Sequence, residues 1–144
     1  MKRTLIQNAR VFNTWLKQFI PGWLLIEDGR IRYAFLDEEC PKDVNQVIDA
    51  EGCFCIPSLI DIHLHIESSM MTPAGFSRAL LRNGVTTCVA EPHEIANVIG
   101  YEGVEEFIHQ GRECQADILW GIPSSVPCSP YETTGRRIEL ADAL

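Results

Sequence analysis

Four ionisable residues alternate along one short apolar stretch of the chain, LIDIHLHIESSM at 59–70, and they are Asp61, His63, His65 and Glu67. In a β-strand, residues two apart project from the same face, so the two imidazoles can converge on one ion. Left buried without partners, such polar groups would each cost about 1–3 kcal/mol. The pattern therefore favours a divalent metal site. A solvent-facing strand with two incidental histidines is the alternative.

Two later segments hold further polar candidates. The segment AEPHEIANV follows an apolar run, VTTCVA, and contains Glu91, His93 and Glu94. The segment GIPSSVPCSPYETTG follows another apolar run and contains Ser124 and Ser125. Loops of this kind could line a pocket with carboxylates, hydroxyls and backbone groups. Ordinary polar connections are the alternative for both segments.

The elements that position these residues change in character at Pro57. Residues 3–13 read as short strands, and WLLIEDGRIRYAFL predicts a hairpin around Asp28 and Gly29, a common tight-turn pair. VIDAEGCFCIP predicts two more short strands around Glu51 and Gly52. We therefore expect 1–56 to form a small all-β domain.

From residue 57 the pattern alternates between strands and helices. Strands are predicted for LIDIHLHI, VTTCVA and DILWGIP, and helices for TPAGFSRALLRNG and GVEEFIHQGREC, with another helix beginning at ELADAL. This order predicts a parallel α/β unit over 57–144. Its apolar residues Ile60, Ile62, Leu64 and Ile66 should pack beneath the helices, and the alternate ionisable residues should point into the interior of a barrel.

Composition limits the partners and the compartment. The chain has 144 residues and a net charge of −8, which disfavours broad electrostatic binding to nucleic acid or to an anionic membrane. No long uncharged apolar stretch indicates a transmembrane segment. The six cysteines form no C-x-x-C pair, so we expect reduced thiols in a cytoplasmic protein.

Three segments together resemble one family. PSLIDIHLHIESSMMTP, GVTTCVAEPHEIANVIG and GIPSSVPCSPYETTG are similar to consecutive signatures of the adenine deaminases of bacteria and archaea, within the amidohydrolase superfamily. The resemblance implies an α/β fold: the opening part of a distorted TIM barrel in 57–144, preceded by a small β-sandwich portion in 1–56. It also implies hydrolytic deamination of adenine to hypoxanthine and ammonia, at a binuclear site whose divalent metal is manganese, with iron or zinc as alternatives.

Residue by residue, the resemblance assigns His63 and His65 as metal ligands. It places Glu67, Glu91, His93 and Glu94 in or around the pocket, and Ser124 and Ser125 in a loop beside the substrate. One departure is Ser58, where the family usually has glycine after proline. The second departure is length, since the family's later ligands come from strands that follow this segment. We therefore expect a truncated or fragment chain with an incomplete active site, which could form a homo-oligomer.

Three other interpretations compete with this resemblance. The compact zinc-dependent nucleobase deaminases use H-x-E with P-C-x-x-C, but Tyr131 stands where the second cysteine is needed. A non-catalytic metal-binding or interaction remnant is compatible with the length. Another amidohydrolase is less compatible with the segment PHEIANV.

Overall fold

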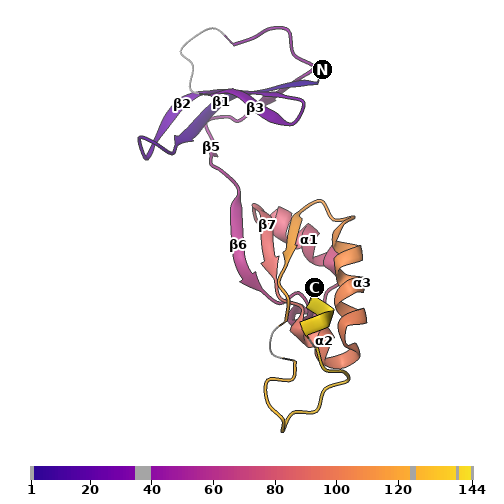
Figure 1. Ribbon diagram of the computed structural model, residues 1–144. Helices are drawn as coiled ribbons and strands as arrows, with labels where there is room; N and C mark the ends of the chain where they lie inside the picture. Colours follow the sequence, from indigo (N-terminus) through magenta and orange to yellow (C-terminus); the bar gives the residue numbers. More distant parts are fainter. Residues whose placement is uncertain (1, 35–39, 124–125, 139, 144) are drawn as a thin grey trace. The chain divides into compact units, whose positions relative to one another are not determined.

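The computed structural model describes residues 2–34, 40–123, 126–138 and 140–143. The chain divides into two compact units, Met1–Pro57 and Ser58–Leu144, named unit 1 and unit 2 below. Each contains its own sheet (Figure 1). The division lies one residue beyond the boundary expected between 1–56 and 57–144.

Unit 1 is a five-stranded sheet with the order β3-β2-β1-β4, in which β5 also pairs with β1. The strands are β1 (Arg3–Asn13), β2 (Gln18–Glu27), β3 (Arg30–Ala34), β4 (Gln46–Asp49) and β5 (Phe54–Cys55). The first three are antiparallel, whereas β4 and β5 both run parallel to β1. Residues 3–13 thus form one long strand instead of several short ones, with a register shift between Ile6 and Ala9.

The turn predicted at Asp28 and Gly29 is confirmed, because it joins β2 to β3 directly. Glu27 pairs with Arg30 across it. Asp28 and Gly29 both have positive φ values, 47° and 81°, as a two-residue type I′ turn requires. This turn matches the right-handed twist of the two strands and sets their register.

The sheet of unit 1 buries apolar side chains on both of its faces. One cluster contains Leu5, Trp23 and Leu25, and the other contains Ala9, Val11 and Leu24. Leu24 and Leu25 fall in different clusters because successive residues of a strand point to opposite faces. Each cluster is small, so each buried side chain carries a large share of the stability of unit 1.

Unit 2 has a three-stranded parallel sheet with the order β6-β7-β8. The strands are β6 (Leu59–Leu64), β7 (Val85–Ala90) and β8 (Asp117–Trp120). The helices are α1 (Pro73–Arg82), α2 (His93–Ile99) and α3 (Tyr101–Gly111), with the short 3-10 helices η1 (Glu67–Ser69) and η2 (Leu140–Ala143). The predicted alternation of strands and helices is confirmed, and α2 is an element that the sequence pattern did not predict.

The helices α1 and α3 lie on the same side of this sheet (Figure 1). Helix α1 begins as its sequence predicts, with Pro73 in the first turn and the Thr72 hydroxyl accepting a hydrogen bond from the Gly75 N–H. Leu80 of this helix packs against Cys88 of β7 and Ala116. On the segment next to β8, the Ala116 N–H donates to the Ser77 hydroxyl at 3.1 Å, inside the protein.

The alternation predicted along β6 does not hold, because the strand contains a register shift. Asp61 pairs with Cys88 of β7, but Leu64, three residues later, pairs with Ala90, only two residues further on. The extra residue in β6 puts Asp61 and His63 on opposite faces. The Asp61 carboxylate instead accepts a hydrogen bond from the His63 N–H at 3.2 Å. The prediction that Asp61 shares a face with the histidines is therefore wrong.

The apolar residues of β6 are also less covered than predicted. Ile66 is fully buried and Leu64 partly so, but Ile60 and Ile62 are 62% and 78% exposed. Two features account for this: α1 and α3 cover only one side of the sheet (Figure 1), and β6 is also an edge strand, with a neighbouring strand on one side only among the described residues. None of the helices in the described part of the chain is long and apolar enough to cross a membrane.

Candidate metal centre

The carboxyl ends of β6 and β7 bring six of the predicted residues together. His63 lies in β6, His65 directly follows it, and Glu91 directly follows β7. Glu67 lies in η1, and His93 and Glu94 open α2. Parallel strands end at the same edge of a sheet, so residues far apart in the sequence become neighbours there. The predicted residues Ser124 and Ser125 lie outside the described residues.

Three imidazole rings form a continuous row at this edge. The ring centroids of His63 and His65 are 5.0 Å apart, and those of His65 and His93 are 4.5 Å apart. Two groups of side chains offer ligand atoms within 4.8 Å of one another. One is His63, His65 and Glu91, and the other is His65, His93 and Glu94. His65 belongs to both, which makes it the centre of the cluster.

The first group is open to solvent on one side. The His63 side chain is 63% exposed, and its Nε2 lies 4.0 Å from Oε2 of Glu91. His65 is more enclosed, and its Nδ1 lies 2.8 Å from the main-chain oxygen of Glu91. Imidazole nitrogens and a carboxylate oxygen at such spacing are a donor set that divalent transition metals bind. These three residues therefore fit a divalent cation.

The second group is built around Glu94. Its Oε2 lies 3.3 Å from Nδ1 of His65 and 3.7 Å from Nδ1 of His93. This oxygen is buried and accepts no hydrogen bond from the residues that the structure describes. The other carboxylate oxygen accepts a hydrogen bond from the Ser68 hydroxyl. A buried acceptor beside two imidazoles concentrates negative charge at this point.

The charge state of Glu94 follows from these contacts. Burial alone would raise the pKa of its carboxyl group. The hydrogen bond from Ser68, the backbone N–H of Glu94 and the two nearby imidazoles act in the other direction, and together they hold the pKa below its ordinary value. Glu94 is therefore an anion at neutral pH.

Glu67 connects η1 to the start of α2. Its Oε1 accepts a hydrogen bond from the Ile95 N–H at 3.2 Å. Pro92, at the position before the helix, makes no capping hydrogen bond with its side chain, so Glu67 satisfies one of the free N–H groups of the first turn. The other Glu67 oxygen is buried and has no hydrogen-bond partner in the described ranges.

Two features of this edge were missed from the sequence. The segment that forms α2 reads as a polar loop, although Pro92 and Glu94 at its start are typical of a helix N-terminus. Nothing in the sequence marks Ser68 as part of the site. Its hydroxyl contacts Glu94, which lies 26 positions later in the chain. No local pattern predicts a contact of that kind, which depends on where two strands end.

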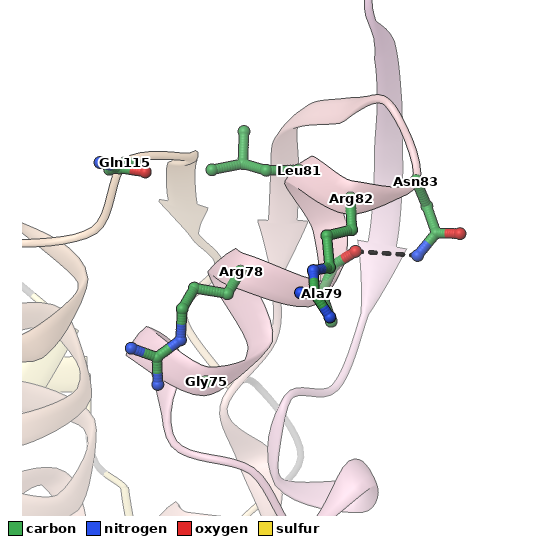
Figure 2. Close-up of a pocket in the computed structure, with 7 residues that line it drawn as sticks. All are labelled: Gly75, Arg78, Ala79, Leu81, Arg82, Asn83 and Gln115. Carbon is green, nitrogen blue, oxygen red and sulfur yellow. Dashed lines mark hydrogen bonds between the residues drawn. The ribbon is translucent and has the colours of Figure 1, made fainter.

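A separate hollow lies over α1, away from the histidines. Figure 2 shows two of its lining residues, Arg78 and Arg82, on successive turns of the helix, with Gln115 across from them. The Asn83 side chain donates to the main-chain oxygen of Ala79 at 2.9 Å. None of the candidate metal ligands lines this hollow.

Comparisons with known proteins show the family to which the chain belongs. Residues 54–142 match the amidohydrolase family. The chain is 51% identical over 140 residues to adenine deaminase 2 of Shouchella clausii strain KSM-K16, covering 96% of this chain and 24% of that protein. It is 50% identical over 136 residues to the adenine deaminase of Clostridium perfringens strain ATCC 13124, covering 93% of this chain and 24% of the relative. The chain thus spans about a quarter of the length of these curated relatives.

Solved structures show the same fold at low sequence identity. L-hydantoinase (dihydropyrimidinase) from Arthrobacter aurescens matches 83% of this chain and 27% of its own, with a TM-score of 0.64 and 20% identity. N-isopropylammelide isopropylaminohydrolase from Burkholderia multivorans ATCC 17616 matches 91% of this chain and 40% of its own, with a TM-score of 0.54 and 16% identity. The predicted fold class is confirmed: the α/β unit fits the opening part of a TIM-barrel type fold.

Proposed function

The chain belongs to the amidohydrolase family, and on this premise we propose that it forms the opening part of a metal-dependent adenine deaminase. The reaction would convert adenine and water to hypoxanthine and ammonia, a step of purine salvage. One observation carries the proposal: His63, His65 and Glu91 converge within 4.8 Å at the carboxyl ends of β6 and β7. They do so in a chain about half identical to adenine deaminases over nearly its whole length.

In this proposal His63 and His65 hold a divalent cation. The family resemblance favours manganese as the ion. Iron and zinc are the alternatives, because a site of imidazole and carboxylate donors does not by itself distinguish among the three. When bound there, such a cation would lower the pKa of a water molecule and so supply a nucleophile near neutral pH. By the family resemblance, the complete site would hold two ions. The strands that follow in the longer relatives would supply its other ligands.

The carboxylates would bind the purine and move protons. Glu91 and Glu94 lie beside the imidazoles. A proton must reach the departing amine, and a carboxyl group of the pocket that first takes a proton from the attacking water would deliver it. We place Glu67 and His93 around the same pocket, with Ser124 and Ser125 in a substrate loop. Residues 1–56 would be part of a β-sandwich and residues 57–144 the first strands of a distorted TIM barrel.

Metal analysis tests the ligand assignment. The purified chain should retain manganese, iron or zinc after dialysis against a weak chelator, and His63→Ala and His65→Ala should each abolish this retention. His109→Ala is the matched control, since His109 is an exposed histidine of α3 that lies in neither group of metal-binding residues. Unchanged metal content in the His63 and His65 variants would reject the assignment.

Ammonia release tests the activity. Incubated with adenine and manganese, the chain should release ammonia far more slowly than a complete adenine deaminase, because it spans about a quarter of such a protein. A rate similar to that of the complete enzyme would overturn the proposal that the site needs further strands. Metal retention without any adenine-dependent ammonia release, even after the remaining strands are supplied as a second chain, would overturn the proposed activity.

A further inference from the structure

The imidazole rings of the two histidines in the candidate metal site, His63 and His65, differ in the contacts that fix their orientation. Nδ1 of His65 lies 2.8 Å from the main-chain oxygen of Glu91. A carbonyl oxygen can only accept a hydrogen bond, so Nδ1 of His65 must be the donor. A neutral imidazole carries a single proton, and Nε2 of His65 is therefore left with a free lone pair. The backbone after β7 thus selects one tautomer of this ring.

We propose that Glu94 is a positioning residue that, together with the main-chain oxygen of Glu91, holds His65 in the tautomer with Nδ1 protonated. This inference rests on the proposed role of His65 as a metal ligand. Its consequence is that Nε2 of His65 faces the cation with its lone pair already available. Glu94 itself then binds no ion, although its carboxylate lies near two imidazoles.

The position of the Glu94 carboxylate supports this role. Its Oε2 lies 3.3 Å from Nδ1 of His65, on the side of the ring that donates to Glu91. A negative charge there favours a proton on Nδ1 over a lone pair, and so fixes the tautomer and the orientation of the ring. Because this oxygen is buried, solvent screens the interaction little.

Two contacts hold Glu94 in place. The Ser68 hydroxyl donates to one of its carboxylate oxygens. Glu67 accepts the Ile95 N–H at 3.2 Å and so attaches the first turn of α2, which carries Glu94, to η1. Glu67 and Ser68 lie only two and three residues after His65, in the short helix η1. The same short segment therefore delivers His65 and fixes the carboxylate behind it.

His63 provides an internal comparison. It is 63% exposed, and the closest carboxylate oxygen in the described structure is 4.0 Å from its Nε2. No main-chain oxygen fixes its ring in the part of the chain that is described. His65 is thus pre-oriented before metal binds, whereas His63 must be ordered by the metal.

Nitrogen-15 NMR of the metal-free chain tests the tautomer directly. Long-range proton–nitrogen correlations, recorded above the pKa range of free histidine, should show His65 protonated on Nδ1 and His63 as a mixture of tautomers. Glu94→Gln should shift His65 toward protonation on Nε2. A wild-type His65 protonated mainly on Nε2 would overturn the inference, and this outcome does not depend on any variant folding.

Metal titration provides the second measurement. Glu94→Gln and Glu94→Ala should weaken manganese binding by roughly 10–100-fold, as expected for loss of a group that orients a ligand. Ser68→Ala should weaken it less. Glu105→Gln, which alters an exposed residue of α3, is the matched control and should have no effect. Wild-type affinity in both Glu94 variants would overturn the positioning role.

The two proposals fail in different ways. If His65→Ala leaves metal binding unchanged, the ligand assignment and the proposed function fail together. If His65→Ala abolishes binding but the Glu94 variants bind normally, only the positioning role of Glu94 fails. If the Glu94 variants lose all binding while the tautomer of His65 is unchanged, Glu94 is a ligand and not a positioning residue.

Discussion

Unit 1 and unit 2 use their ionisable side chains in different ways. In unit 1 these residues form separate pairs between strands and loops, such as the half-buried Arg3 with Glu27 of the neighbouring strand at 3.0 Å and with the exposed Asp43 at 3.2 Å. In unit 2 they gather at one edge of the sheet, around His65. Strand direction accounts for the difference. The antiparallel strands β1 to β3 end alternately at opposite edges, whereas β6 to β8 all end at the same edge.

The parallel order of the strands, more than the amino-acid composition, therefore brings the candidate ligand side chains of unit 2 together. Ion pairs at the surface, such as that of Arg3 with the exposed Asp43, contribute little to stability, typically about 0–1 kcal/mol. We expect the stability of unit 1 to come mainly from its small apolar clusters, while unit 2 also has to hold the buried Ser77 and one buried carboxylate oxygen of Glu94. Three substitutions test this division.

The largest effect is expected in the core of unit 1. Leu25 is fully buried, and Leu25→Ala should destabilise this unit by about 2–5 kcal/mol, since it removes apolar contacts and leaves a cavity. Denaturant unfolding followed by tryptophan fluorescence measures the change, and Leu16→Ala, at an exposed position, is the control. Metal binding by unit 2 should survive. Its loss in Leu25→Ala alone would show that the site depends on unit 1.

An intermediate effect is expected at a buried polar contact of unit 2. Ser77 is 1% exposed, and its hydroxyl accepts the Ala116 N–H at 3.1 Å. Ser77→Ala leaves that N–H buried without a partner and should cost about 1–3 kcal/mol. Urea unfolding gives the value, with the exposed Thr133→Ala as the control. A change no larger than that of the control would mean that water replaces the hydroxyl.

The smallest effect is a dependence on alkaline pH that belongs to unit 2. Burial, with help from Asp61 and Cys114, raises the pKa of the Cys88 thiol to about 11 from its ordinary 9.0. The folded state therefore holds this proton more tightly than the unfolded state. The resulting contribution to stability is complete below pH 9 and is lost as the pH rises toward about 11.

Unfolding curves measured at several pH values between 8 and 11 test this expectation. Cys88→Ala should flatten the decline in stability, whereas Cys53→Ala, at an exposed cysteine of unit 1, should leave it as in the wild type. An equal decline in all three proteins would show that other groups cause the alkaline destabilisation.

Much of the local structure was predictable because it depends on neighbouring residues. Asp28 and Gly29 predict a two-residue turn through their tolerance of positive φ. Thr72 and Pro73 predict the start of α1, through a side-chain cap and a ring that suits the first turn. The order of strands and helices in unit 2 follows from the periodicity of its apolar residues.

The arrangement of the candidate site was less predictable, because it depends on contacts between distant segments. Alternation along β6 predicted that Asp61 would join the histidines, but pairing with β7 shifts the register and turns Asp61 away. The helix α2 has few local signals, and Glu67, 28 positions before Ile95, satisfies its first turn. A register is set by the neighbouring strand, which a single segment of sequence does not reveal.

The sequence by itself determined which groups could do chemistry here: two histidines, two positions apart, in an apolar strand, followed by an acidic segment after the next strand. Residue type and spacing suffice for that, because they define donor atoms and local geometry. Only the tertiary structure decided that the main-chain oxygen of Glu91 would meet Nδ1 of His65, and that Glu94 would lie behind that ring. Those contacts exist because parallel strands end at a common edge, where residues 26 positions apart come within hydrogen-bonding distance.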